Sequence, residues 1–384
     1  MKLSDFNYDL PEERIAKHPP KVRGASRLLV LGRKNGEIQD SKYADLIDFL
    51  NPGDVLILND TKVMKSRILT TNERGAEREL VTLEKHSGDH DWHQHRVVYR
   101  GKLRVGDKLS LVGDNSLSVT VVEILDGGLA IISSKMDLLE LTEKYGQPPL
   151  PPYLKRNATK TDMKRYQTIF AHDPGSAAAP TASLNMTNEL LKKLRAKGVK
   201  IAYLTLHVGL GTFLPIRVDE IENHHMHAEY FTVPPETIET IREAKLSGHR
   251  VIALGTTVAR TLEYAAKTKS RFPEDRKLGR VALSLAGDRF PEGYRPGQTA
   301  LSAPSGKWSP ARYNTISGEA DIFIYPGYEF KCIDALLTNF HAPKSTVLML
   351  AAAFAGWKNL KKAYDYARDK KYNFLSYGDS MLIL

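Results

Sequence analysis

The chain has 384 residues, of which 42% are hydrophobic and 26% are charged, a composition that excludes the disordered and fibrous classes and, at this length, favours two domains. A single cysteine, Cys332, excludes an intrachain disulfide, and no apolar run reaches the roughly 20 residues of a membrane span. The formal net charge of +10 favours a polyanionic partner, although charge alone leaves open a basic protein without one. No signal-peptide pattern opens the sequence, so we expect a cytoplasmic protein with no membrane partner.

The first 60 residues and those after about residue 165 both contain apolar runs with strand-like and helix-like spacing. Residues 28–31 and 54–59 predict buried strands, and residues 43–50 predict a helix that Pro52 and Gly53 end. The later part predicts, in chain order, a helix over 188–197 capped by Thr187, strands over 199–206 and 251–255, a helix over 256–266, a strand over 321–325, and an apolar helix between Ser345 and Gly356. Such alternation is typical of α/β domains.

The stretch from about residue 62 to 145 has a different pattern. Short β-rich runs separated by Gly, Asp and Asn turns predict strands over 76–83, 96–100, 108–112, 117–124 and 129–133. Strands at this spacing favour a small antiparallel barrel or sandwich. The prolines over 148–152 suit either a rigid crossing between domains or a surface loop. We therefore expect a discontinuous α/β domain, 1–61 and 150–384, with a small antiparallel β-barrel domain inserted at 62–149.

Polar side chains that could carry chemistry follow several predicted strands. Residues 59–62 lie where α/β sheets tend to bind ligands, although a turn with a helix cap explains the same residues. His207 precedes the glycines Gly209 and Gly211, and a histidine there can transfer a proton or can simply pack in the interior. The small residues over 173–181 either let a ligand approach the backbone or form a flexible connection.

Two further clusters lie later in the chain. If residues 223–229 are extended, His225, His227 and Glu229 share one face and could bind zinc, but their spacing matches no standard zinc motif. Proton transfer, or recognition of a nucleobase or sugar, is favoured there instead. Lys344 and the free N–H groups at the start of the apolar helix offer an anion site, unless Ser345 only caps that helix. These residues together indicate a basic, cytoplasmic, proton-transferring enzyme with an anionic ligand.

Motifs along the whole chain give a more specific hypothesis. They run in order from one end of the chain to the other and include Asp5-Phe6-x-Tyr8-Asp9-Leu10-Pro11, Leu58-Asn59-Asp60-Thr61-Lys62-Val63, Tyr166-Gln167-Thr168, Ala178-Ala179-Pro180-Thr181-Ala182, Thr205-Leu206-His207-Val208-Gly209-x-Gly211-Thr212-Phe213, His224-His225-Met226-His227, Gly255-Thr256-Thr257, Tyr325-Pro326-Gly327-Tyr328 and Leu337-Thr338-Asn339-Phe340-His341-x-Pro343-Lys344-Ser345-Thr346. With these motifs the chain closely resembles the S-adenosylmethionine:tRNA ribosyltransferase-isomerase family of the bacterial queuosine pathway.

The resemblance implies an unusual reaction. The ribosyl part of S-adenosylmethionine is transferred to 7-aminomethyl-7-deazaguanine at the tRNA wobble position and isomerised, which gives epoxyqueuosine-tRNA and releases adenine and methionine. The partners are tRNA and S-adenosylmethionine as a substrate, with no metal or redox cofactor, and a monomer is favoured over an obligate oligomer. The implied fold is again an α/β domain with an inserted β-barrel.

The resemblance also implies a set of site residues. The catalytic candidates, which would exchange protons near the sulfonium, the purine and the amine, are His207, His225, His227, His341 and Asp60. The substrate-binding candidates are Asn59, Thr61, Lys62, Tyr166, Gln167, Pro180, Thr181, Asn185, Gly209, Gly211, Thr212, Thr256, Thr257, Tyr325, Gly327, Asn339, Lys344 and Ser345.

One segment departs from the family pattern. After Ala182 the family usually continues Gly-Leu-His-Phe-Thr, whereas this chain has Ser183-Leu184-Asn185-Met186-Thr187, and Leu214 replaces a common glutamine. Asn185 cannot exchange a proton near neutrality, and Met186 lacks an aromatic face that could stack on a base. The departure raises an alternative to an active enzyme, namely a catalytically altered or inactive tRNA-binding relative. Tolerated sequence drift is the other explanation.

Overall fold

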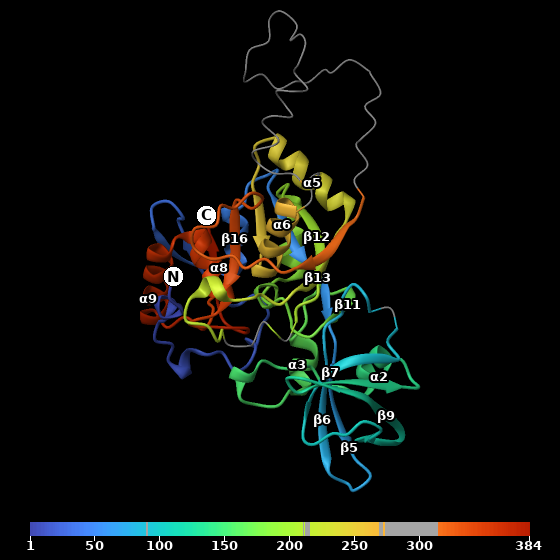
Figure 1. Ribbon diagram of the computed structural model, residues 1–384. Coiled ribbons are helices and arrows are strands. Elements are labelled where there is room, and N and C mark those ends of the chain that lie inside the picture. The colour runs from blue at the N-terminus through green and yellow to red at the C-terminus, as the bar shows by residue number, and fades with distance from the viewer. Residues whose placement is uncertain (90, 210, 212–215, 269–271, 273–313) are drawn as a thin grey trace, which may run out of the picture.

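A nine-stranded mixed sheet forms the centre of the larger part of the molecule (Figure 1). The computed structural model describes residues 1–89, 91–209, 211, 216–268, 272 and 314–384. The strand order is β15-β13-β12-β3-β14-β16-β17-β1-β2. In that order the strands are Ile316–Ala320, Glu229–Val233, Lys200–Leu206, Val55–Asn59, Val251–Leu254, Ala335–Asn339, Ser380–Ile383, Arg27–Leu31 and Ile38–Lys42. The central strands β12, β3, β14 and β16 run parallel, so their carboxyl ends lie at one edge of the sheet.

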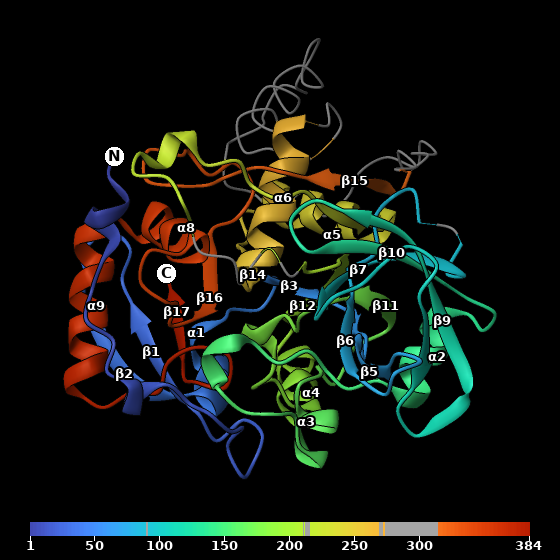
Figure 2. The ribbon, with the colours of Figure 1, turned by 60° about the horizontal axis from the view of Figure 1, so that its bottom comes forward.

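Helices cover both faces of this sheet (Figure 2). Along β3, Val55 and Ile57 pack into one core while Leu56 and Leu58 pack into the other, because successive strand residues point to opposite faces. The first core is closed by α5 (Pro235–Leu246), α6 (Thr256–Thr268), α8 (Thr346–Ala355) and α9 (Trp357–Asp369). The second is closed by α1 (Leu46–Phe49) and α4 (Asn188–Ala196). A sheet buried on both faces explains why its strands read as continuous apolar runs.

The strand β17 has an unusual place in the sheet. It lies between β16, to which it is antiparallel, and β1, to which it is parallel, so Leu28 pairs with Ser380. The hairpin of β1 and β2 is therefore attached to the rest of the sheet through the last strand in chain order.

The β-rich stretch forms a closed antiparallel barrel in the order β10-β7-β6-β5-β8-β9, so the barrel prediction is confirmed over the sandwich. In that order its strands are Leu129–Ser134, Gln94–Arg100, Glu77–Thr82, Arg67–Thr71, Lys108–Leu111 and Asp114–Leu125. Ile68, Leu80, Val97 and Leu109 fill its interior, beside the short helix α2 (Leu138–Tyr145). All six strands fall inside the interval 62–149, whose two borders remain predictions.

The barrel is joined to the α/β part by direct contacts. The short strands β4 (Thr61–Val63) and β11 (Asp173–Ser176) pair in parallel, and the Lys85 N–H donates to the Gly175 carbonyl at 2.8 Å. Glu319 of β15 contacts a ring nitrogen of His86 at 3.2 Å. The remaining short elements are η1 (Leu3–Phe6), η2 (Glu12–Arg14), η3 (Tyr43–Asp45), η4 (Pro152–Leu154), α3 (Lys160–Arg165), η5 (Thr181–Ser183) and η7 (Ile221–Asn223).

Most of the predicted elements are present, with two differences. The helix expected over 43–50 is split into η3 and α1. The strand expected over 321–325 is wrong, because the strand β15 ends at Ala320 and the next residues have no strand pairing. Ile322 and Ile324 are nevertheless buried, so their apolar pattern reflects packing rather than strand pairing. None of the helices within the described ranges is long and apolar enough to cross a membrane.

Candidate active site

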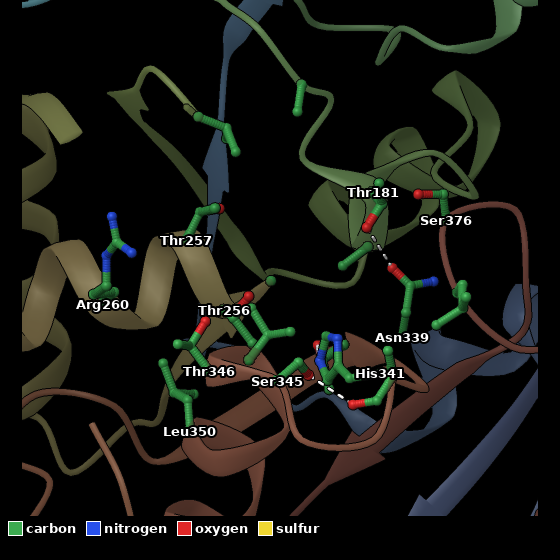
Figure 3. Close-up of a pocket in the computed structure, with 18 of the residues that line it drawn as sticks. Thr181, Thr256, Thr257, Arg260, Asn339, His341, Ser345, Thr346, Leu350 and Ser376 are labelled. Atoms are coloured by element: carbon green, nitrogen blue, oxygen red, sulfur yellow. Dashed lines mark hydrogen bonds between the residues drawn. The ribbon is translucent and has the colours of Figure 1, made fainter. Parts of the chain in front are cut away.

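A cavity of about 450 Å³ opens beyond the carboxyl ends of β14 and β16 (Figure 3). Its walls come from the segment before and within η5, the start of α6, the loop between β16 and α8, and the irregular segment 322–324. Its position is the one that α/β sheets use for ligands, and its size is that of a small-molecule site. The predicted substrate-binding residues that line it are Pro180, Thr181, Thr256, Thr257, Asn339, Lys344 and Ser345. The predicted catalytic residue that lines it is His341.

One wall is fixed by a hydrogen bond between η5 and the end of β16. Thr181 Oγ1 donates to Asn339 Oδ1 at 3.0 Å, and Asn339 Nδ2 donates to the Asp379 carbonyl at 3.4 Å. Asn339 is the last residue of β16, so the strand end places its amide at the cavity, near Ser376 in Figure 3. This end of the cavity offers amide and hydroxyl groups, which can donate hydrogen bonds to a planar polar ligand and accept hydrogen bonds from it.

His341 lies beside that wall. A ring nitrogen is 2.8 Å from Thr338 Oγ1, and the backbone is held by Tyr364, whose hydroxyl accepts the His341 N–H at 2.8 Å, and by Tyr8, whose hydroxyl donates to the carbonyl. Burial lowers the pKa of His341 to about 3. The imidazole is therefore neutral near pH 7, so one ring nitrogen is a hydrogen-bond donor and the other is an acceptor.

The start of α8 forms another side of the cavity. Ser345 Oγ accepts the Leu348 N–H at 3.3 Å and donates to the Ala342 carbonyl at 2.7 Å, so the capping interpretation is confirmed. Ser345, Thr346 and Val347 also line the cavity, so the cap and the anion site are compatible. Lys344, with a positive φ of 57°, donates its N–H to the Phe6 carbonyl at 3.0 Å, and the residue is exposed.

Sequence reasoning missed a buried ion pair in the cavity wall. Arg260 of α6 donates through Nη2 to Glu229 Oε2, and Glu229 Oε1 accepts the Gly209 N–H at 2.7 Å. The exposed fractions of Glu229 and Arg260 are 3% and 7%. Arg260 follows Thr256 by four residues in α6, so the two share one face of the helix, and Thr256 also lines the cavity. That spacing is the signal in the sequence, but Arg260 belongs to none of the motifs.

A second group of predicted residues lies at the ends of β3 and β12. Asn59 Nδ2 donates to the Leu206 carbonyl at 3.0 Å, and Asn59 Oδ1 accepts from the N–H groups of Leu206 and Thr61 at 3.0 and 3.1 Å. Asn59 Nδ2 is also 3.4 Å from Thr257 Oγ1. Asn59 therefore positions the cavity residue Thr257 from behind rather than lining the cavity.

His207 lies in this second group, not among the residues that line the cavity. Its Nδ1 is 2.8 Å from Thr61 Oγ1, and its ring stacks on Tyr230. The ring also lies against Gly175, where a Cβ would be 2.8 Å from the imidazole and φ is 150°, so only glycine fits there. Burial, assisted by the nearby Lys85 ammonium, lowers the pKa of His207 to about 4.

Asp60 is hydrogen-bonded to Thr205. Its Oδ1 accepts from Thr205 Oγ1 at 2.7 Å. Burial and the neighbouring Asp173 raise the pKa of Asp60, while the Thr205 hydrogen bond opposes the rise. Lys62, which is half-buried in β4, and Gln167, which bonds the Val63 backbone in both directions at 3.2 Å, lie near the same strand pair.

The histidine-rich segment does not form the expected shared face. His225 and His227 are exposed, whereas Glu229 is buried against Arg260 and Met226 lines the cavity. Within the described residues no group of three or more His, Cys, Asp or Glu side chains could hold a metal ion. Gly211 lies against His227, and Gly209 gives its N–H to Glu229. Thr212 and Leu214 lie outside the described residues.

Three other predicted residues lie outside the cavity lining. Tyr166 is buried in a small core behind Ala179. Tyr325 packs its ring against Phe323, and Gly327 is exposed in the following turn with a φ of 101°.

The segment that departs from the family pattern is turned into the interior. Asn185 Oδ1 accepts from Ser26 Oγ at 2.8 Å, and its Nδ2 donates to the Gly378 carbonyl at 3.1 Å and to Ser380 Oγ at 3.3 Å. Met186 is fully buried in the core beneath the sheet. These side chains therefore support the loop that carries Thr181, and none of them lines the cavity.

Comparison with known proteins gives a consistent result. A family model described as queuosine biosynthesis protein matches residues 3–383. Proteins named S-adenosylmethionine:tRNA ribosyltransferase-isomerase from Pelodictyon phaeoclathratiforme and Chlorobium phaeobacteroides are 50% and 51% identical to this chain, over 100% of both chains. A crystal structure of S-adenosylmethionine tRNA ribosyltransferase from Thermotoga maritima is 31% identical, covers 99% of this chain and 100% of its own, and has a TM-score of 0.52.

Proposed function

The chain belongs to the queuosine biosynthesis family of S-adenosylmethionine:tRNA ribosyltransferase-isomerases, and from that premise we infer that it works at the cavity beyond β14 and β16. It transfers and isomerises the ribosyl part of S-adenosylmethionine onto 7-aminomethyl-7-deazaguanine in tRNA, which releases adenine and methionine. The observation that carries the placement is that family motifs from three separate segments, at Thr181, Thr256 and Asn339, line one cavity.

The residues around the cavity suit the chemical demands of that reaction. The adenine leaving group needs hydrogen bonds or a proton, and Asn339, Thr181 and the neutral imidazole of His341 offer these at one end. The protons beside the sulfonium are acidified by its charge, so a neutral base can remove one. We assign that proton transfer to His341, because it alone among the predicted catalytic residues lines the cavity.

His207 and Asp60 have a different proposed role. They lie at the ends of β12 and β3, near the contacts with the barrel, and His207 is neutral near pH 7. The attacking amine on the tRNA base must lose a proton, and the carboxylate of Asp60, whose pKa is raised by burial, is the group on that side suited to accept it, while the buried His207 ring holds Thr61 in place. The chain's net charge of +10 suits the tRNA phosphates. We propose a cytoplasmic monomer that needs no metal or redox cofactor.

The departing segment does not favour an inactive relative. Asn185 and Met186 replace a histidine and a phenylalanine, yet their side chains lie in the interior and have their partners there. The proton transfers assigned above do not depend on a side chain at position 185.

The test uses the purified protein with S-adenosylmethionine and tRNA that carries the deazaguanine precursor. We expect free adenine, measured by chromatography, and the epoxyqueuosine mass in the digested tRNA. The same protein treated with a chelator serves as the cofactor control and should retain activity. Absence of adenine, under conditions where the Thermotoga maritima relative releases it, would contradict the proposal.

A further inference from the structure

The pair of Arg260 and Glu229 has features that a purely structural ion pair does not need. Both residues line the cavity, although they belong to different elements, α6 and β13. Removing two charges from water costs more than their attraction returns unless further bonds compensate, so a pair that only tied α6 to β13 could be replaced by apolar packing. Their place in a cavity wall indicates a polar ligand group at that point.

The hydrogen bonds of Arg260 use only part of its guanidinium. Nη2 donates to Glu229 Oε2, whereas Nε is buried and has no partner among the described residues. A guanidinium carries five donors in a planar fork, and a carboxylate fits that fork through two parallel hydrogen bonds. Glu229 is held in turn by the Gly209 N–H at 2.7 Å, so the fork is fixed before a ligand arrives.

The position of Arg260 separates it from the adenine end. In Figure 3 Arg260 lies on one side of the cavity and Asn339 and Ser376 on the other, with Thr256 and Thr346 between them. The Glu229 carboxylate balances the Arg260 charge, so this end of the cavity is neutral overall but carries both signs. A ligand group with a carboxylate and an ammonium, such as the free end of an amino acid, complements such a pair.

We propose that Arg260, positioned by Glu229, binds the α-carboxylate of the methionine part of S-adenosylmethionine. The inference rests on the proposed function and adds to it how the substrate is oriented along the cavity. The amino-acid end lies at α6, the adenine lies at the end of β16, and the sulfonium lies between them near His341. The Arg260 fork then selects nucleosides that carry an amino-acid carboxylate over those that lack it.

The test compares three nucleosides in the complete reaction with precursor tRNA, by adenine release. They are S-adenosylmethionine as substrate, with decarboxylated S-adenosylmethionine and 5′-methylthioadenosine as competitors that lack the carboxylate. For the unchanged protein, we expect the KM for S-adenosylmethionine to be about 10- to 100-fold below both inhibition constants, the range of one charge-assisted hydrogen-bond pair. Equal constants for the three nucleosides would overturn the inference.

Variants assign that preference to the residue. Arg260→Met should raise the KM for S-adenosylmethionine about 10- to 100-fold and leave both inhibition constants within about twofold, because only the carboxylate contact is lost. The double variant with Glu229→Gln and Arg260→Met avoids leaving a buried unpaired carboxylate and should give the same pattern. Arg260→Lys keeps the positive charge but lacks the planar fork, so its KM for S-adenosylmethionine should lie between those of the unchanged protein and Arg260→Met.

The possible outcomes separate the inference from the function. A carboxylate preference that survives in a folded Arg260→Met or double variant overturns the assignment to Arg260 while the transferase activity stands. An unchanged protein that releases no adenine overturns the proposed function itself. Thermal unfolding of each variant shows whether a raised KM comes from a folded protein.

Discussion

The two groups of polar residues at the carboxyl edge of the sheet have similar composition but different surroundings. At the ends of β14 and β16, Asn339 and His341 line an open cavity. At the ends of β3 and β12, Asn59 and His207 have their polar atoms joined to the backbone and to Thr61. Asn339 and His341 also form hydrogen bonds within the fold, so the difference teaches that an Asn or His at a strand end indicates a site by its place at a cavity and not by its hydrogen bonds alone.

The interior group still contributes to the site. Asn59 joins β3 to β12 and contacts the hydroxyl of Thr257, while Gly175, which has no side chain, leaves space for the ring of His207. Through these contacts the second group fixes the backbone from which the cavity wall is built. A substitution there should therefore affect stability first, and activity through geometry.

The largest expected effect separates the two histidines. His341→Asn should lower kcat for adenine release by about 100-fold or more, because the proton-transfer group is lost, and should lower the free energy of unfolding by about 1–3 kcal/mol, because the buried Thr338 hydroxyl loses its partner. His207→Asn should lower the free energy of unfolding by about 1–3 kcal/mol, because Thr61 loses a buried partner. Steady-state kinetics and urea unfolding measure both. A His341 variant with full kcat would remove the cavity from the mechanism.

Two asparagines offer a matched comparison of intermediate size. Asn185→Ala should lower the free energy of unfolding by about 1–3 kcal/mol, since Ser26 and the Gly378 carbonyl lose buried partners, with the KM for S-adenosylmethionine unchanged. Asn339→Ala should instead raise that KM by about tenfold, because its amide lines the cavity. If Asn185→Ala raised the KM as much as Asn339→Ala, the departing segment would belong to the site after all.

The smallest effect concerns pH. The folded pKa of His207 is about 4, below the ordinary value of about 6.5, so the unfolded chain binds this proton more readily. The stability that the neutral ring contributes is complete above pH about 6.5 and is lost as the pH falls toward 4, by at most about 1.4 kcal/mol per pH unit. Urea unfolding of the protein and of His207→Gln between pH 7 and 5 isolates this part. If the free energy of unfolding changed with pH in the same way for the unchanged protein and for His207→Gln, the ring of His207 would not be held neutral.

The sequence specifies the local elements better than their arrangement. The run before Asn59, the cap at Thr187 and the apolar helix after Ser345 all follow from patterns within a few residues. The segment 321–325 was mistaken for a strand because burial against helices and burial within a sheet give the same apolar pattern. The order of strands in the sheet depends on contacts between distant residues, which local patterns do not contain.

The site shows the same limit. Thr181, Thr256 and Asn339 were identified through family motifs, whereas no local pattern indicated that they lie together. Arg260 was missed because its meaning depends on Glu229, which is 31 residues earlier and on another element. His225 and His227 are catalytic candidates through a family motif, yet both side chains are exposed on either side of the cavity residue Met226.

The place of β17 has a consequence for how the protein is made. During translation β1 leaves the ribosome early, but its parallel neighbour β17 is synthesised last in chain order. Until then β1 and β2 form a hairpin with an open edge, and β16, which carries Asn339, lacks a neighbour on one side. The nascent chain therefore carries two unpaired strand edges until β17 has been made, and that one short strand closes both, so bulky additions next to Ile383 would disturb assembly of the binding cavity.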